Sequence, residues 1–188
     1  ADRMLDLGFS GELDQVFAAL PRKRQTLLFS ATFSDAIRQM AGNLLRDPLS
    51  IEVTPRNAAA KTVKQWLVTV DKKRKGELML HLLRTQPWGK GQALVFVKTR
   101  KGVDQLEQEL RAAGISVDAI HGDKPQATRL RALDGFKAGA VQILVATDVA
   151  ARGLDIHDLP LVVNFDLPIV AEDYVHRIGR TGRAGRSG

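Results

Sequence analysis

The last part of the chain carries a regular series of arginines. The stretch HRIGRTGRAGR, residues 176–186, has an arginine at every third position from Arg177 to Arg186, with glycines between them and no acidic residue. Unpaired cations this close repel one another, so the arrangement is favourable only where an anion lies between them. Phosphate is the natural candidate, because a guanidinium group donates two parallel hydrogen bonds to its oxygens. The alternative is a solvated basic tail.

These arginines begin within a predicted helix. Apolar residues such as Tyr174 and Ile178 recur at helical spacing, and Gly179 is expected to end the helix. Arg180 and Arg183 then project from a glycine-rich turn, where their guanidinium groups can converge on one anion.

Basic residues are unevenly distributed along the chain. The net charge of the 188 residues is +7, but residues 1–60 hold seven acidic and seven basic side chains, so the whole excess lies beyond them. A basic surface of this kind suits nucleic acid or a nucleotide phosphate, a merely soluble basic protein being the alternative.

Other classes of site find no support in the composition. The chain has no cysteine, and its four histidines lack the spacing of metal ligands, so we predict no metal site. A cysteine-free chain is typical of a reducing compartment, and no apolar run of 18 residues or signal peptide is present. We therefore expect a cytoplasmic protein that does not enter a membrane.

Apolar runs of strand length alternate with helical patterns. This alternation predicts an α/β fold, a doubly wound parallel sheet with right-handed crossovers and helices on its faces. The predicted strands are 26–29, 50–53, 63–70, 93–97, 115–120, 141–146 and 161–164, and the predicted helices lie near 10–19, 34–46, 74–85, 100–113, 124–138 and 169–178.

A linker divides this pattern unequally. Residues 54–62, TPRNAAAKT, are polar, include a proline and lie where the charge balance changes. The part before them, residues 1–53, has too few predicted strands and helices for an independent α/β domain, whereas residues 63–188 are long enough for one.

Three polar clusters come directly after predicted strands: SAT at 30–32, HGD at 121–123 and TD at 147–148. In open α/β sheets ligands gather at the carboxyl ends of the strands. The alternative is that these residues cap helices, because Asp123 and Gln126 have the spacing of a capping box and Asp148 could act likewise. Their occurrence at three strand ends favours a ligand surface.

Together these segments resemble the DEAD-box RNA helicases of superfamily 2, and within them the bacterial RhlE type. HRIGRTGR (176–183) is similar to motif VI of that family, ATDVAARGLDI (146–156) to motif V, SAT to motif III, LVFVKTR (94–100) to motif IV, HGDKPQATR (121–129) to the Q-x-x-R element, and ADRMLDLGF (1–9) to the last residues of the DEAD motif and the segment directly after it. The resemblance implies a RecA-like second lobe at 63–188, truncated after motif VI, preceded by the C-terminal remnant of a first lobe at 1–53.

The resemblance also implies roles for individual residues. The positions that match the nucleotide-binding ones are Asp155, Gly153, Arg180 and Arg183, the two arginines being those that reach the γ-phosphate during hydrolysis. The positions that match the RNA-binding ones are Thr99, Gly122, Gln126, Arg129, Thr147 and Arg152. The positions that match the coupling between lobes are Ser30, Thr32, His176 and Asp2. For Gln126 the capping and RNA-binding roles compete.

The implied activity is ATP-dependent local separation of short RNA duplexes, with ATP and Mg²⁺ bound mainly by the missing part of the first lobe. RNA should bind without sequence preference, because hydroxyls, amides and cations suit phosphates and 2′-hydroxyls. We expect a monomer. No G-x-x-x-x-G-K-[ST] loop occurs in the sequence, so the chain alone should hydrolyse no ATP. The alternatives are a non-catalytic RNA-binding or adaptor module and a DNA helicase with the same two lobes.

Overall fold

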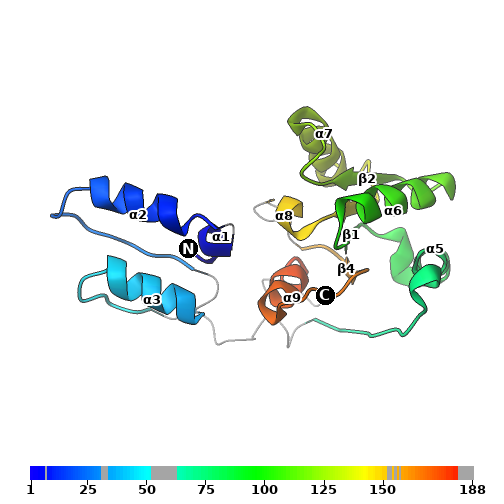
Figure 1. The fold of residues 1–188 in the computed structure, drawn as a ribbon. Coiled ribbons are helices and arrows are strands. Elements are labelled where there is room, and N and C mark those ends of the chain that lie inside the picture. The colour runs from blue at the N-terminus through cyan, green and yellow to red at the C-terminus, as the bar shows by residue number, and fades with distance from the viewer. Residues whose placement is uncertain are drawn as a thin grey trace. The chain divides into compact units, whose positions relative to one another are not determined.

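The described part of the chain forms two compact units, Ala1–Val53 and Thr54–Gly188 (Figure 1). The structure, a computed structural model, describes residues 1–6, 8–30, 34–51, 63–151, 154, 156 and 158–181, without the side chains of Arg3, Asp6, Pro87, Trp88 and Glu172. The predicted linker 54–62 lies outside these residues. Each unit is considered by itself.

The second unit is built on a four-stranded parallel sheet with the order β2-β3-β1-β4. In this order Phe96 lies opposite Ala146 and Asn164, and Ala146 lies opposite Ile120, so the four strands end at one level. The predicted α/β parallel sheet is thereby confirmed. The strands are β1 (Ala93–Phe96), β2 (Val117–Ile120), β3 (Ile143–Ala146) and β4 (Leu161–Asn164).

Helices cover both faces of this sheet. Those described are α5 (Lys75–Thr85), α6 (Arg100–Ala112), α7 (Gln126–Lys137), α8 (Asp148–Ala151) and α9 (Ala171–Ile178), with 3₁₀ turns η1 (Lys72–Arg74) and η2 (Pro87–Lys90). None of the helices described is long and apolar enough to cross a membrane.

The core results from the alternation of side chains along each strand. On one face Val95 and its neighbours pack with α5 and α6, whose Leu83 and Leu106 are buried there. On the other face Leu94 and Phe96 pack with Phe136 of α7 and with α8. Two apolar layers therefore fix the ends of the strands, where the loops begin.

The first unit is smaller and mostly helical. It contains α1 (Asp2–Asp6), α2 (Ser10–Ala19) and α3 (Asp35–Leu44), and Ser34 caps α3 by accepting a hydrogen bond from the Ile37 N–H at 3.4 Å. Ile37 is the buried apolar residue of this unit among those described. Other apolar side chains described in this unit, such as Phe29 and Leu49, are exposed.

Two predicted strands, 26–29 and 63–70, are wrong, and residues 50 and 51 of a third are likewise outside any strand. Their apolar side chains are exposed instead, as at Phe29 (79%) and Leu67 (81%). A strand exists only when its N–H and C=O groups pair with a neighbour, and no partner strand is present for these segments among the described residues. Sequence patterning indicates the apolar run but not the partner.

Candidate functional site

Three loops meet at the carboxyl edge of the sheet. Because β3 lies between β2 and β1, Thr147 at the end of β3 lies between the loop of Gly122 and the loop of Thr99. The N–H of Thr147 donates to the carbonyl of Ile120 at 3.3 Å, and the N–H of Val97 donates to the carbonyl of Ala146 at 3.0 Å. The fold thus brings together three of the residues that the sequence assigned to RNA. We call Thr99, Gly122 and Thr147 the carboxyl edge.

Thr99 is fixed by the helix that begins directly after it. Its Oγ1 accepts a hydrogen bond from the N–H of Gly102 at 3.0 Å, so Thr99 is the N-cap of α6. An N-cap side chain satisfies one amide that the first turn leaves without a partner inside the helix. The position that is proposed to contact RNA also stabilises α6.

Gly122 lies against a cation that the sequence analysis missed. A Cβ at Gly122 would lie 3.6–3.7 Å from the guanidinium of Arg100, which forms an ion pair with Asp123. The alternative that Asp123 and Gln126 form a capping box is wrong, because α7 begins at Gln126 with Pro125 as its N-cap and no side-chain cap. The sequence signal that could have indicated Arg100 was its position directly after Thr99, a predicted RNA-binding residue.

Gln126 and Arg129 lie one turn apart on α7, as the sequence predicts. Arg129 Nη1 donates to Gln126 Oε1 at 3.1 Å. Arg129 Nε is a buried side-chain nitrogen for which the described residues provide no acceptor. The Gln126 side chain is therefore engaged with Arg129 rather than with a helix cap.

A buried histidine, His121, fixes the loop that follows β2 through hydrogen bonds. His121 is 3% exposed, its Nε2 lies 2.9 Å from Asp104 Oδ1, and its Nδ1 accepts from the N–H of Asp123 at 3.3 Å. Burial would raise the pKa of Asp104, but the hydrogen bond and charge of His121 and the charge of Lys124 outweigh it, so this pKa lies below its ordinary value of 3.8. Lys124 also donates to the buried Glu107 at 2.7 Å. These contacts fix the loop to α6.

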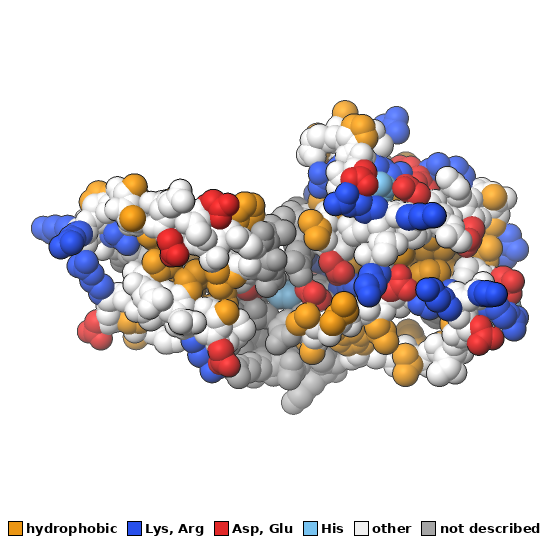
Figure 2. All heavy atoms as spheres, viewed as in Figure 1, with side chains coloured by type: hydrophobic (Ala, Val, Ile, Leu, Met, Phe, Trp, Pro, Cys, Tyr) orange, Lys and Arg blue, Asp and Glu red, His pale blue; other side chains and the backbone are white. Residues whose placement is uncertain are grey.

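Not all of the surface of the second unit is basic. On the face seen in Figure 2, Lys and Arg side chains lie among Asp and Glu side chains. Many of the cations near the carboxyl edge have acidic partners, such as Arg100 with Asp123 and Lys124 with Glu107. A polyanion at this edge would have to compete with those carboxylates.

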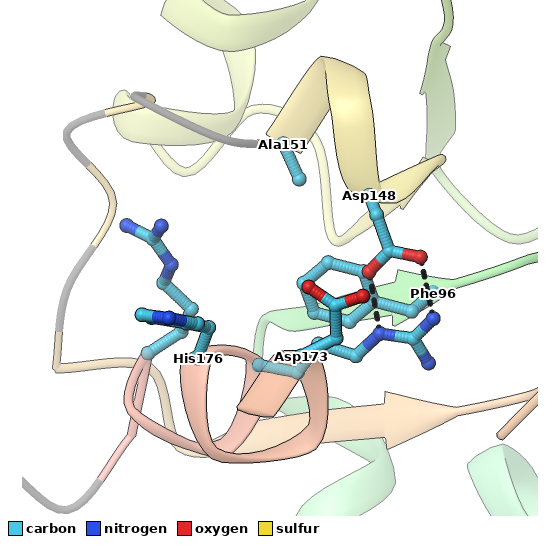
Figure 3. Close-up of a pocket in the computed structure, with 7 residues that line it drawn as sticks. Phe96, Asp148, Ala151, Asp173 and His176 are labelled. Carbon is cyan, nitrogen blue, oxygen red and sulfur yellow. Dashed lines mark hydrogen bonds and ion pairs between the residues drawn. The ribbon is translucent and has the colours of Figure 1, made fainter. Parts of the chain in front are cut away.

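A shallow hollow lies beside α9 (Figure 3). It is lined by Phe96, Asp148, Ala151, Asp173, His176, Arg177 and Arg180, so it joins the ends of β1 and β3 to the arginine series. The hollow is shallow and open to solvent, and it encloses no ligand-sized space.

Arg177 corrects the prediction that the arginines have no acidic partner. Its Nε and Nη2 donate to the two carboxylate oxygens of Asp148, each at 2.6 Å (Figure 3). Its Nη1 donates to Asn164 Oδ1 at 2.8 Å and to the carbonyl of Asp166 at 2.6 Å, and its guanidinium lies 4.8 Å from the centre of the Phe96 ring. The sequence around Arg177 does not indicate this pairing, because Asp148 lies 29 residues away, just after the end of β3, and only the fold brings the two side chains together. The alternative role of Asp148 as a helix cap is also wrong.

Arg180 and His176 both line the hollow. Arg180 Nη1 donates to the carbonyl of Leu154 at 3.0 Å, and its own carbonyl accepts from the N–H of Leu159 at 3.1 Å. As predicted, the helix ends at Gly179, which is its C-cap. Of the two arginines of the series that the structure describes, Arg177 is buried and paired, and Arg180 lines the hollow.

Several predicted site residues lie outside the described residues: Thr32, Arg152, Gly153, Asp155 and Arg183. In the first unit, the N–H of Asp2 donates to Ser30 Oγ at 3.3 Å, so these two predicted coupling residues are in contact. No group of three or more potential metal ligands occurs in the part of the chain that the structure describes.

Comparison with known proteins assigns this site to a family. The model of the helicase conserved C-terminal domain matches residues 74–185. The DEAD-box ATP-dependent RNA helicase CshA of Geobacillus kaustophilus is 45% identical over 188 residues, which are 100% of this chain and 40% of that protein. CshA of Bacillus subtilis is 42% identical over the same length, 38% of that protein.

Solved structures agree with these relatives. The chain is similar to S. cerevisiae Dbp5 bound to RNA and ADP BeF3, with a TM-score of 0.85, 35% identity, and coverage of 100% of this chain and 49% of that one. It is also similar to a DEAD box protein from Methanococcus jannaschii, with a TM-score of 0.63, 37% identity, and coverage of 100% and 50%. The predicted RecA-like fold is thereby confirmed.

The chain spans 38–50% of the length of these proteins. Their names do not test the narrower RhlE assignment, which stays a prediction. The family model covers more than half of the chain, and its relatives match it from end to end. This chain therefore belongs to the helicase conserved C-terminal domain family, and within it to the DEAD-box RNA helicases.

Proposed function

We propose that the chain supplies the second RecA-like lobe, and part of the first, to a helicase that couples ATP binding and hydrolysis to local unwinding of short RNA duplexes. The observation that carries this proposal is that one rigid sheet holds the carboxyl edge and, through α9, Arg180. One unit thus contributes to two ligand sites. The matches to ATP-dependent RNA helicases support it.

RNA binds at the carboxyl edge through its backbone. Thr99, Gly122, Gln126, Arg129, Thr147 and Arg152 offer hydroxyls, amides and guanidinium groups, which suit phosphates and 2′-hydroxyls and do not read bases. Binding is therefore independent of sequence. The 35% identical Dbp5 is described as bound to RNA and ADP BeF3, which supports this assignment.

ATP binds between the lobes, and the second lobe supplies cations to its phosphates. Arg180 and Arg183 stabilise the charge that develops on the transferred phosphoryl group, an effect of about 10³ to 10⁵ in rate in comparable enzymes. Asp155 and Gly153 contact the nucleotide beside them. Mg²⁺ would be held mainly by the part of the first lobe outside this chain, where it would supply positive charge to the phosphates of ATP.

Coupling between lobes runs through Ser30, Thr32, Asp2 and His176. ATP and RNA both favour the closed pair of lobes, so each strengthens the binding of the other. The whole helicase is a cytoplasmic monomer of the RhlE type. Since the sequence contains no G-x-x-x-x-G-K-[ST] loop, this chain alone hydrolyses no ATP.

The deciding experiment is Arg180→Ala in the complete helicase, with RNA binding and ATP turnover measured separately. We expect turnover to fall by about 10³-fold or more while RNA affinity changes by less than about threefold. Arg74→Ala is the matched control, because Arg74 is exposed and pairs only across one helical turn with Glu77. Unchanged turnover in Arg180→Ala would favour the adaptor module, and equal unwinding of ribose and deoxyribose duplexes would favour the DNA helicase.

A further inference from the structure

The loop after β2 turns around a single residue, His121. Its ring accepts a hydrogen bond from the N–H of Asp123 at 3.3 Å through Nδ1, and its carbonyl accepts from the N–H of Lys124 at 3.2 Å. Gly122 lies inside this turn, and α7 begins at Gln126, two residues after it. The turn therefore sets the position of Gly122 and the start of the helix that carries Gln126.

The two neighbours of the ring determine which nitrogen carries its proton. His121 Nε2 lies 2.9 Å from Asp104 Oδ1, and the lowered pKa of Asp104 keeps this carboxyl group ionised at neutral pH. An ionised carboxylate can only accept a hydrogen bond, and the backbone N–H of Asp123 can only donate one. Both contacts are satisfied together when Nε2 carries the proton and Nδ1 presents its lone pair. The geometry thus selects one tautomer.

Burial makes this selection strict. His121 is 3% exposed, so water has little access to the ring. With the proton on Nδ1, or with the ring turned over, two N–H groups would face each other beside Asp123. A buried donor without an acceptor is costly, because no solvent replaces the lost hydrogen bond. The loop therefore has one favourable arrangement.

Asp104 ties this arrangement to α6, the helix that Thr99 caps. A second connection runs beside the first: Lys124 Nζ lies 3.4 Å from Asp104 Oδ1 and donates to Glu107 Oε2 at 2.7 Å. The loop of Gly122 is thus joined to the helix that begins after Thr99. Two members of the carboxyl edge are thereby held in a fixed relation to each other.

We propose that His121 is a positioning residue for RNA: Nδ1 fixes the loop of Gly122, and Nε2 joins that loop to α6, so that Gly122 and Thr99 meet the same RNA strand. This inference rests on the proposed function. The ring is buried and does not itself touch RNA. Without the Nδ1 contact Gly122 is free to move, and RNA binds more weakly. The ATP site is unaffected, because its proposed residues come from other loops.

The test separates the two ring nitrogens in the complete helicase. In His121→Asn the amide oxygen occupies the place of Nδ1 and still accepts from the N–H of Asp123. In His121→Gln the longer side chain reaches Asp104 in the place of Nε2, but it offers no acceptor in the place of Nδ1. The readouts are the Kd for single-stranded oligouridine and the apparent KM for ATP at saturating RNA.

We expect His121→Gln to raise the Kd for RNA about tenfold, the factor that corresponds to one lost hydrogen bond of ordinary strength, and His121→Asn to stay within about threefold of the wild type. The apparent KM for ATP should change by less than about twofold in both variants, about the resolution of such assays. Nitrogen-15 NMR of the wild type should show the proton of the His121 ring on Nε2, its signals being assigned by their loss in His121→Asn.

Gln92→Met is the matched control. The Gln92 amide donates to the carbonyls of Phe136 and Val141 at the amino ends of the strands, away from the carboxyl edge. Its loss should lower the melting temperature and leave the Kd for RNA unchanged. RNA binding of every variant is compared at one fixed interval below its melting temperature.

A further variant keeps the test decisive if His121→Gln does not fold. Asp104→Leu changes a side chain that is 43% exposed and leaves the Nε2–H buried without its acceptor. The ring then turns away from Asp123, and the Kd for RNA should rise about fivefold, somewhat less than for the complete loss of one hydrogen bond.

Four results would overturn the inference: equal Kd values for His121→Asn and His121→Gln, a rise in Gln92→Met as large as in His121→Gln, an unchanged Kd in Asp104→Leu, or a wild-type ring with its proton on Nδ1. A wild-type helicase that binds no RNA would instead overturn the proposed function, and the inference with it.

Discussion

The sharpest prediction concerns the burial of Arg177. Replacing Asp148 with Asn removes a carboxylate that accepts two hydrogen bonds, each of 2.6 Å, from a guanidinium that is almost inaccessible to water. The amide of Asn can accept one of them, but its NH₂ group then faces a donor. Arg177 keeps Asn164 and the carbonyl of Asp166 as acceptors, but these are neutral.

The expected cost comes from removing the carboxylate that a buried cation contacts directly, although the charge of Asp166 remains nearby. Breaking a buried pair in this way destabilises proteins by about 3–5 kcal/mol. The unfolding free energy of a typical domain is about 5–15 kcal/mol, so the variant should fold but lose a large fraction of its stability. With an m-value of about 2 kcal/mol/M, the urea midpoint should fall by about 1.5–2.5 M.

Urea unfolding monitored by tryptophan fluorescence measures this directly, because both tryptophans of the chain, at positions 66 and 88, belong to the second unit. The matched control is Glu77→Gln, which breaks an ion pair whose side chains are 70% and 71% exposed, and should cost less than about 0.5 kcal/mol. A midpoint for Asp148→Asn that lies within about 0.3 M of the control, close to the resolution of such titrations, would refute the argument from burial.

Three further predictions concern stability. Thr99→Ala should cost about 1 kcal/mol through loss of the α6 cap, and Thr99→Ser should restore it; equal urea midpoints for the two would contradict the capping role. The pKa values of Asp104 and Asp166 are lowered in the folded state, so the unfolding free energy should be constant above about pH 5 and fall as the pH drops below 3.8. The fall should be less steep in Asp166→Asn. A flat profile of unfolding free energy from about pH 5 to 3 in urea titrations would argue against this prediction. Gly89→Ala should cost about 1–3 kcal/mol, because a Cβ there would lie 2.6 Å from the carbonyl carbon of Leu83; an unchanged melting temperature would show that the 3₁₀ turn can move.

The sequence predicts well where local patterns decide the structure. The helix at 100–112 and the strands at 93–96 and 143–146 agree with the periodicity, because their apolar faces meet a partner within the described residues. The segment 63–70 is also rich in apolar residues, but it has no partner strand among the described residues, and the prediction of a strand there is wrong. Composition specifies a preference, and pairing decides the outcome.

The site shows the same division. The position of Thr99, Gly122 and Thr147 at one edge is a consequence of the rule that parallel strands end together. The pairing of Asp148 with Arg177 could not be predicted, because it depends on strand order, which brings together residues 29 apart in sequence. No acidic residue occurs among residues 176–186, and the sequence therefore predicted wrongly that Arg177 has no acidic partner.

The extended segment 63–70 has a consequence for how the chain behaves in a test tube. Its main-chain amides and carbonyls are not paired with a neighbouring strand among the described residues, and the side chains of Leu67 and Val68 are exposed to solvent. Such a stretch can template pairing with the same stretch of another molecule, a route to fibrils and precipitation. Lys64 at one end and Lys72 at the other repel a second copy, as gatekeeper charges do. Salt that screens the charges of these two lysines should therefore speed precipitation.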